Sequence, residues 1–271
     1  MDVKLPVAGL VVEAWGLALR SALPSLPWLA GLMVTAGLYR LALYLHAGAI
    51  INLMLLVVVF AAGVAFSLRV YRSMLGASSG TFLKLAHANL SIYMAFLFVG
   101  VFIAFFLAIL PGILLEVSGR TDLDAKTDPA IVQAAFMDML PTAYGAVFIL
   151  ACALGLWALC FFAIRLLLVG AATISRGETM VFRTWPWTKG HALRLSIAAM
   201  ATHVGPFFAA IAINAALAPL LGTAPAGLFI GGALGVLLLA PFLLAGHGLA
   251  VSALPRLAPD AAELAEIATS G

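Results

Sequence analysis

The sequence predicts an all-α integral membrane protein, and three properties of the chain lead to this prediction. Apolar residues make up 65% of its 271 residues and charged residues only 9%, whereas a soluble domain carries about a quarter charged residues because its surface meets water. The apolar residues form runs long enough to cross a hydrocarbon core of about 30 Å as helices, which satisfy their own backbone hydrogen bonds in lipid. Alternating segments of about ten residues, the pattern of a membrane β-barrel, do not occur.

Six transmembrane helices are predicted. They lie at residues 27–46, 49–70, 91–115, 142–168, 192–220 and 226–253. The third, SIYMAFLFVGVFIAFFLAILPGILL, is the most uniformly apolar, whereas Arg40 interrupts the first. Residues 1–256 then form one polytopic membrane domain, and residues 257–271 form a cytoplasmic tail.

Basic residues collect on one side of the membrane when the loops are assigned to alternate sides. That side receives Lys4, Arg20, Arg69, Arg72, Lys84, Arg165, Arg176, Arg183, Lys189, Arg194 and Arg256. The opposite side receives Arg120 and Lys126, together with five of the eleven acids in the loop 116–140. An excess of Lys and Arg marks the cytoplasmic side, so both termini are predicted to be cytoplasmic.

The segment SRGETMVFRTWPWTKGHALRLS, residues 175–196, combines cations with two tryptophans between two apolar runs, and we call it the cationic island. Its lipid-headgroup or interface candidates are Arg176, Arg183, Trp185, Trp187, Lys189 and Arg194. Indole rings suit the headgroup layer, and each cation close to an anionic leaflet gains about 1 kcal/mol. The island is therefore predicted to be either a membrane-surface anchor or a specific phosphate or headgroup site.

Two further segments repeat this arrangement before spans one and three. LPVAGLVVEAWGLALRSALPSLPW and RSMLGASSGTFLKLAHANLS each join a short, partly amphipathic stretch with basic residues and then a helical hairpin. The repeat predicts three hairpins, each preceded by an interfacial amphipathic segment. The first segment fits equally well as a cytoplasmic extension of span one.

The island also carries a resemblance to a known family. MVFRTWPWTKGHALRLSIA is similar to the membrane domain of bacterial glycerophosphoryl diester phosphodiesterases and of their stand-alone relatives of unknown function. The matching residues are Thr184, Trp185, Thr188, Lys189, Gly190 and Arg194. VVEAWGLALRSALPSL resembles that family's opening segment, whereas Pro186 and the long acidic outer loop depart from its pattern. The resemblance implies a six-helix domain of the bacterial inner membrane, without phosphodiesterase activity, because that chemistry belongs to a separate soluble barrel.

Four polar residues map to the outer half of the membrane: Arg40, Asn52, Glu116 and Asn214. Ionisable groups at such depth are costly and suggest a function. One hypothesis pairs Arg40 with Glu116 and lets all four line an outward-facing cavity. The alternative is that Arg40 snorkels to the headgroups and the asparagines cap or cross-link helices.

A glycine stripe in span six predicts close helix packing. Gly227, Gly231 and Gly235 are spaced four apart in GLFIGGALG and so share one helix face. Small residues allow another helix to approach. The partner is predicted to be span five of the same chain or span six of a second copy, with the first arrangement preferred.

No catalytic constellation, metal or cofactor is predicted. The aspartates in DLDAKTDPA, Asp122, Asp124 and Asp128, lack the glycine and closing glutamate of a calcium loop. His203 and His247 could meet around haem or a metal, but interhelical hydrogen bonds fit them better. Cys152 and Cys160 are about 12 Å apart on one helix, too far for a disulfide. The cations flank membrane spans rather than forming a basic domain, which excludes nucleic-acid binding.

These observations leave three function classes in order of preference. The first is a non-enzymatic inner-membrane protein that acts through lipid headgroups, protein partners or a second copy, for example in envelope organisation. The second is a transporter for a small solute or lipid, which the prolines within the spans, Pro111, Pro206 and Pro241, would suit. The third is an intramembrane enzyme acting on lipid, for which the sequence offers no nucleophile, base or metal cluster.

The predicted topology can be tested by labelling single cysteines in intact cells. In a chain whose two native cysteines are replaced by Ala, a membrane-impermeant maleimide should modify Lys126→Cys directly. It should modify Lys189→Cys only after the membrane is permeabilised, because the island is cytoplasmic. The reverse labelling pattern would invert the topology and remove the headgroup hypothesis.

Overall fold

The computed structural model describes residues 5–76, 79–120, 123 and 127–259. All regular structure in these ranges is helical. Six helical segments are long and apolar enough to cross a membrane: Val7–Tyr44, Ala49–Leu75, Phe82–Val117, Ala143–Arg176, Ala192–Leu221 and Pro225–Leu257. The prediction of an all-α, multi-pass membrane protein is confirmed. Lys4, Asp122, Asp124, Lys126 and most of the predicted tail lie outside the described residues.

The first helix is longer than its predicted span. α1 runs without a break from Val7 to Tyr44, through Pro24 and Pro27. The predicted interfacial segment is thus the N-terminal part of the spanning helix, which was the alternative interpretation. The buried residues Leu10, Ala14 and Ala18 continue one packed face into this part, so tertiary packing holds the helix together across its prolines.

The segment before span three is also largely part of the spanning helix that follows it. α3 extends from Phe82 to Val117 and includes residues that were predicted to lie in a separate interfacial stretch. Leu85 and Ala88 in its first turns are fully buried. Of the three predicted interfacial segments, only the cationic island is separate from the spanning helix that follows it.

The described chain divides into two compact units, residues 1–91 with 164–271, and residues 92–163. The second unit contains most of α3 and α5 (Ala143–Leu166) together with α4 (Pro129–Met139). α4 lies in the loop that was predicted to be outside the membrane. Asp128 caps it by accepting a hydrogen bond from the Ala130 amide at 2.8 Å, and Pro129 occupies its first turn, a favourable N-terminal pairing.

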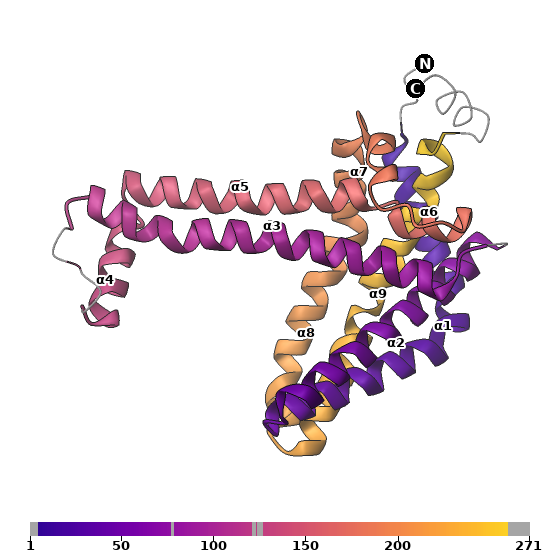
Figure 1. Ribbon diagram of the computed structural model, residues 1–271, viewed down its shortest axis with the longest axis horizontal. Coiled ribbons are helices and arrows are strands. Elements are labelled where there is room, and N and C mark those ends of the chain that lie inside the picture. Colours follow the sequence, from indigo (N-terminus) through magenta and orange to yellow (C-terminus); the bar gives the residue numbers. More distant parts are fainter. Residues whose placement is uncertain (1–4, 77–78, 121–122, 124–126, 260–271) are drawn as a thin grey trace. The chain divides into compact units, whose positions relative to one another are not determined.

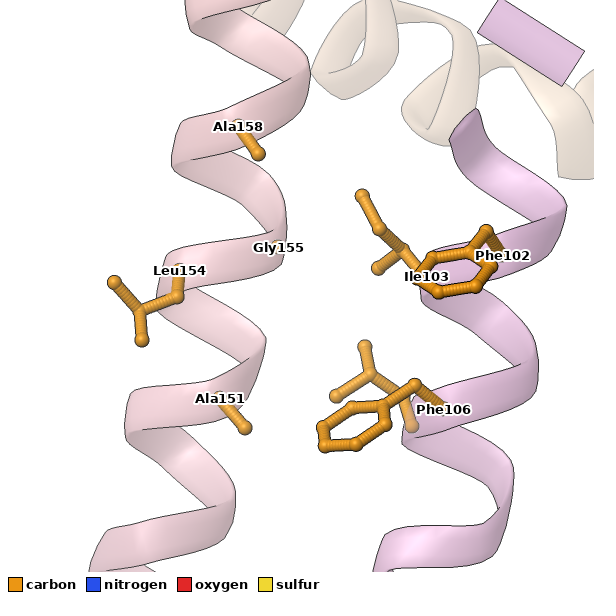
Figure 2. A pocket seen from close by; sticks show the side chains of 8 residues that line it. Phe102, Ile103, Phe106, Ala151, Leu154, Gly155 and Ala158 are labelled. Carbon is orange, nitrogen blue, oxygen red and sulfur yellow. The ribbon is translucent and has the colours of Figure 1, made fainter. Parts of the chain in front are cut away.

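The two long helices of this second unit face each other through side chains of unequal size. Figure 2 shows Ile103 and Phe106 of α3 opposite Ala151 and Gly155 of α5. A Cβ atom at Gly155 would lie 2.8 Å from Ile103, so this glycine allows the close approach. The helices leave an apolar cavity of ≈ 280 Å³ between them.

The first unit is built around the long contact between α1 and α9 (Pro225–Leu257) (Figure 1). α2 (Ala49–Leu75) and α8 (Gly205–Leu221) pack beside this pair. Two glycines of α9 make the contact close. A Cβ at Gly232 would meet Ala36 O and Gly37 Cα at 2.9 Å, and one at Gly248 would clash with Ala14 O.

This packing differs from the predicted glycine stripe. Gly231 lies against the Arg40 guanidinium, Gly227 lies against the carbonyl of Leu221 in the preceding turn, and Gly235 has open space at its Cβ position. The backbone of α1 approaches α9 at Gly232 and Gly248, both outside the predicted stripe. A spacing of four defines a helix face, but only the neighbouring helix decides which face is used.

A widened turn precedes Pro206. Residues Met200–Val204 form a π-helical segment between α7 (Ala192–Ala199) and α8. Proline has no amide hydrogen, and its ring crowds the carbonyl four residues earlier, here that of Thr202. A π turn is a common accommodation of such a break, and here it lies just before Pro206.

The short helix α6 (Val169–Arg176) lies inside the first unit, and residues 169–174 are all buried. The last carbonyls of a helix have no partner within the helix, so they need other donors. The Gly80 amide donates to Ile174 O at 3.0 Å, Ser79 Oγ donates to Ser175 O at 3.4 Å, and Lys84 Nζ donates to Gly177 O. The chain after α2 thereby closes the end of α6.

The role of Gly232 can be tested by adding one methyl group. Gly232→Ala should lower the free energy of unfolding by about 1–3 kcal/mol, because the new Cβ overpacks the α1 contact. Gly235→Ala is the matched control and should be neutral or stabilise by up to about 1 kcal/mol, since its Cβ position is open. Unfolding titrations in mild detergent measure both, and equal effects would contradict the observed packing.

Candidate functional site

The cationic island folds into two short 3₁₀ turns, η1 (Phe182–Thr184) and η2 (Pro186–Thr188). Thr184 and Thr188 are fully buried, and the Thr188 hydroxyl donates to Trp185 O at 3.1 Å. Pro186 stands at the start of η2, where a missing amide hydrogen costs nothing. This local structure sets the positions of Trp185, which lies between the two turns, and of Trp187, which lies within η2.

Each of the two tryptophans contacts an arginine side chain of the first unit. The Arg165 guanidinium carbon lies 4.9 Å from the Trp185 ring centroid, and that of Arg176 lies 4.6 Å from the Trp187 ring. These are cation–π distances, and the interaction strengthens when the cation is shielded from water. Arg165 is only 7% exposed, so the island is held onto the unit through paired aromatic and cationic groups.

The remaining cations of the island are more accessible. Arg183 is exposed and pairs with Glu178 at 3.0 Å. Lys189 is exposed at the end of η2, and Arg194 is half-buried in the first turn of α7. The six predicted interface residues therefore fall into two sets. Trp185, Trp187 and Arg176 are held against the fold, whereas Arg183, Lys189 and Arg194 remain at its edge.

A cavity of ≈ 550 Å³ lies beside the island in the first unit. Its lining residues come from the N-terminal part of α1, the end of α2, the end of α6 and the end of α9 with the residues that follow it. Leu17, Met74 and Leu254 contribute apolar surface, and Glu13 and Arg176 contribute charge. The site thus combines an apolar wall with a charged one.

The charged wall is ordered by hydrogen bonds. Arg256 Nη2 donates to Glu13 Oε2 at 2.8 Å, and its Nη1 donates to Ser252 O. Arg176 Nη2 donates to Pro259 O at 2.9 Å while its guanidinium stacks on Trp187. Both arginines are therefore positioned by contacts with α9 or its C-terminal end.

Glu13, Arg165 and Arg256 were not among the predicted site residues. A signal for Glu13 was present, because it is the only acid between Asp2 and Glu116 and so stands alone on the cation-rich side. The sequence placed it on a polar helix face. It could not show that Arg256, 243 residues away, would be its partner.

The predicted outer polar cluster is divided between the two units. Arg40 lies against Gly231, and Asn52 Nδ2 donates to Ala47 O at 2.6 Å, which resembles a cap. Asn214 is half-buried in α8, and all three belong to the first unit, whereas Glu116 belongs to the second. The pairing of Arg40 with Glu116 stays a prediction.

His203 and His247 lie close to the same turn of α9. The Nε2 atom of His203 lies 2.7 Å from the position of a Cβ on Gly246, the neighbour of His247. The His247 ring packs 4.5 Å from Tyr71, and its Nδ1 bonds to Leu243 O. Within the described ranges, no three His, Cys, Asp or Glu side chains are grouped as metal ligands would be.

The chain was also compared with known proteins. No protein-family model, curated protein or solved structure matches it. The resemblance to the membrane domain of glycerophosphoryl diester phosphodiesterases therefore stays a prediction.

The Arg165–Trp185 contact should contribute measurably to stability. Trp185→Leu should lower the free energy of unfolding by about 2 kcal/mol, because a desolvated cation–π contact is lost and the arginine stays buried. Trp28→Leu is the control, since Trp28 is 49% exposed on α1, and it should change stability by less than about 0.5 kcal/mol. Thermal unfolding in detergent compares the two, and equal losses would argue against the contact.

Proposed function

We propose that this multi-pass protein of the bacterial inner membrane is non-enzymatic and binds the headgroups of anionic lipids, with a role in envelope organisation. The lipid-binding surface is the cationic end of the first unit, which contains the island and the adjoining helix ends. Protein partners or a second copy would act through the same membrane surface. This end faces the cytoplasm in the proposed topology.

The charge at this end is the observation that carries the proposal. Its described residues include ten cations, namely Arg20, Arg69, Arg72, Lys84, Arg165, Arg176, Arg183, Lys189, Arg194 and Arg256, and two acids, Glu13 and Glu178. An anionic leaflet attracts such an excess by about 1 kcal/mol for each cation near its surface. Negative lipid charge is therefore the complementary partner.

The cations held by the two tryptophans and the cations at the edge of the island support two parts of this function. Arg165 and Arg176, stacked on tryptophans, keep the turns against the unit. Lys189 and Arg183 then extend from turns whose positions are already set. A surface ordered before binding loses less side-chain entropy when it meets the lipid.

The experiment is a lipid-retention measurement on the purified full chain. The protein is extracted in mild detergent from membranes of mixed phosphatidylglycerol and phosphatidylcholine, and the retained lipid is quantified by mass spectrometry. The wild type should retain phosphatidylglycerol preferentially. A triple variant with Arg183→Gln, Lys189→Gln and Arg194→Gln should lose most of that preference, because three cations at the edge are removed.

Arg40→Gln is the matched control, since it removes a cation from the other end of the first unit. It should leave the preference unchanged. A triple variant that retains phosphatidylglycerol as the wild type does would overturn the proposed function. An equal loss in the control would show that the retention reflects net charge rather than this surface.

A further inference from the structure

The cavity beside the island has the chemical character of a binding site for one amphiphile. Its volume of ≈ 550 Å³ lies within the range of about 300–1,000 Å³ that is typical of small-molecule pockets. Leu17, Met74 and Leu254 come from three different helices and form an apolar wall, whereas Glu13 and Arg176 stand on the charged side. A ligand that fills it needs an apolar part and a polar head.

The charges at the cavity determine whether the polar head of the ligand should be negative or positive. Glu13 and Arg256 form an ion pair at 2.8 Å and cancel each other. Arg176 adds one positive charge. It contacts Trp187 and Pro259 O, and it has no acidic partner in the described part of the chain. A head with a single negative charge would make the group neutral.

Arg176 is also arranged to receive such a head. Its guanidinium is stacked on Trp187, and one donor, on Nη2, is used for Pro259 O. A guanidinium has five N–H donors in a planar fork that matches phosphate oxygens. The stacked side chain needs little reordering, so the remaining donors can bind an oxyanion at low entropic cost.

We propose that this cavity binds one monoanionic phospholipid, with its phosphate on Arg176 and an acyl chain against Leu17, Met74 and Leu254. The inference rests on the proposed function and deepens it, because it names one site and one class of lipid. Glu13 serves as a selectivity residue. Because its carboxylate neutralises Arg256, a second negative charge on the head finds no free cation at the site, so the site disfavours dianionic phosphomonoester lipids and binds phosphatidylglycerol.

The test is native mass spectrometry of the full chain in a neutral detergent, titrated with defined lipids. One phosphatidylglycerol should bind per chain, and phosphatidylcholine should bind at least ten-fold more weakly. Arg176→Gln should weaken phosphatidylglycerol binding about ten-fold, which corresponds to one charge-assisted contact. Leu17→Trp, which fills the apolar wall, should weaken it similarly. Thermal unfolding verifies that each variant is folded.

Two further arms separate the parts of the inference. Inorganic phosphate and glycerol phosphate at millimolar concentration should not displace the lipid, because they have no apolar chain. Glu13→Gln should increase binding of phosphatidic acid at about pH 9, where its phosphomonoester carries nearly two charges. Effective displacement by a soluble phosphate would replace the lipid with a free anion as ligand. Unchanged phosphatidic acid binding would remove the selectivity role of Glu13.

Arg120→Gln is the matched control for Arg176→Gln, since Arg120 is exposed, pairs with Asp138, does not line the cavity and is not part of the proposed lipid-binding surface. It should leave the one-to-one adduct unchanged. Equal losses in both variants, or none in Arg176→Gln, would overturn this inference while the triple-variant result still supports the proposed function. If neither the triple variant nor Arg176→Gln changes the retention of phosphatidylglycerol, both the proposed function and this inference are overturned.

Discussion

The structure of the first unit depends on one constraint, the need to satisfy the backbone of a helix that is buried on all sides. The residues of α6 from Val169 to Ile174 are inaccessible to solvent, and an unpaired buried carbonyl costs about as much as a lost hydrogen bond. Gly80 can donate to Ile174 O because a glycine allows its backbone to approach that closely. Lys84, at the start of α3, donates to Gly177 O and places a positive charge at the negative end of the α6 dipole. Closing α6 therefore draws the loop after α2 and the first turn of α3 to the same place.

The contacts of the cationic island determine how the arginines near α6 can interact with a ligand. Arg165 precedes α6 and Arg176 is its last residue, and each stacks on one tryptophan of the island. The stacking retains the positive charge while it supplies packing. A cation held in this way is available for a ligand only in the directions that its aromatic partner leaves open. For Arg176 one of those directions is the cavity that Glu13 and Leu17 also line, and this links the packing of α6 to the lipid site that we propose.

Much of the architecture could be predicted from composition and hydropathy. The prediction of six helices long and apolar enough to cross a membrane was confirmed, because a bilayer requires about 20 apolar residues for each helix and SIYMAFLFVGVFIAFFLAILPGILL meets this requirement without any tertiary context. The ends of helices were harder to predict. α1 continues to Val7 because Leu10 and Ala14 pack in the core, and the sequence pattern alone fits an interfacial helix equally well. α4 follows a recognisable Asp128–Pro129 start, yet it lies in a charged loop where hydropathy gives no signal.

The sequence by itself determined that the chain is a membrane protein, how many of its helices can cross the bilayer and where its cations are concentrated, because these properties depend on local composition. Only the tertiary structure decided that the α1 backbone packs against Gly232 and Gly248, whereas in the predicted stripe Gly231 meets α1 only through the Arg40 side chain. It also decided that Glu13 meets Arg256 and that Arg176 meets Trp187. Such pairings join distant parts of the chain, and the periodicity of one helix identifies a face but not the residue that will lie opposite it.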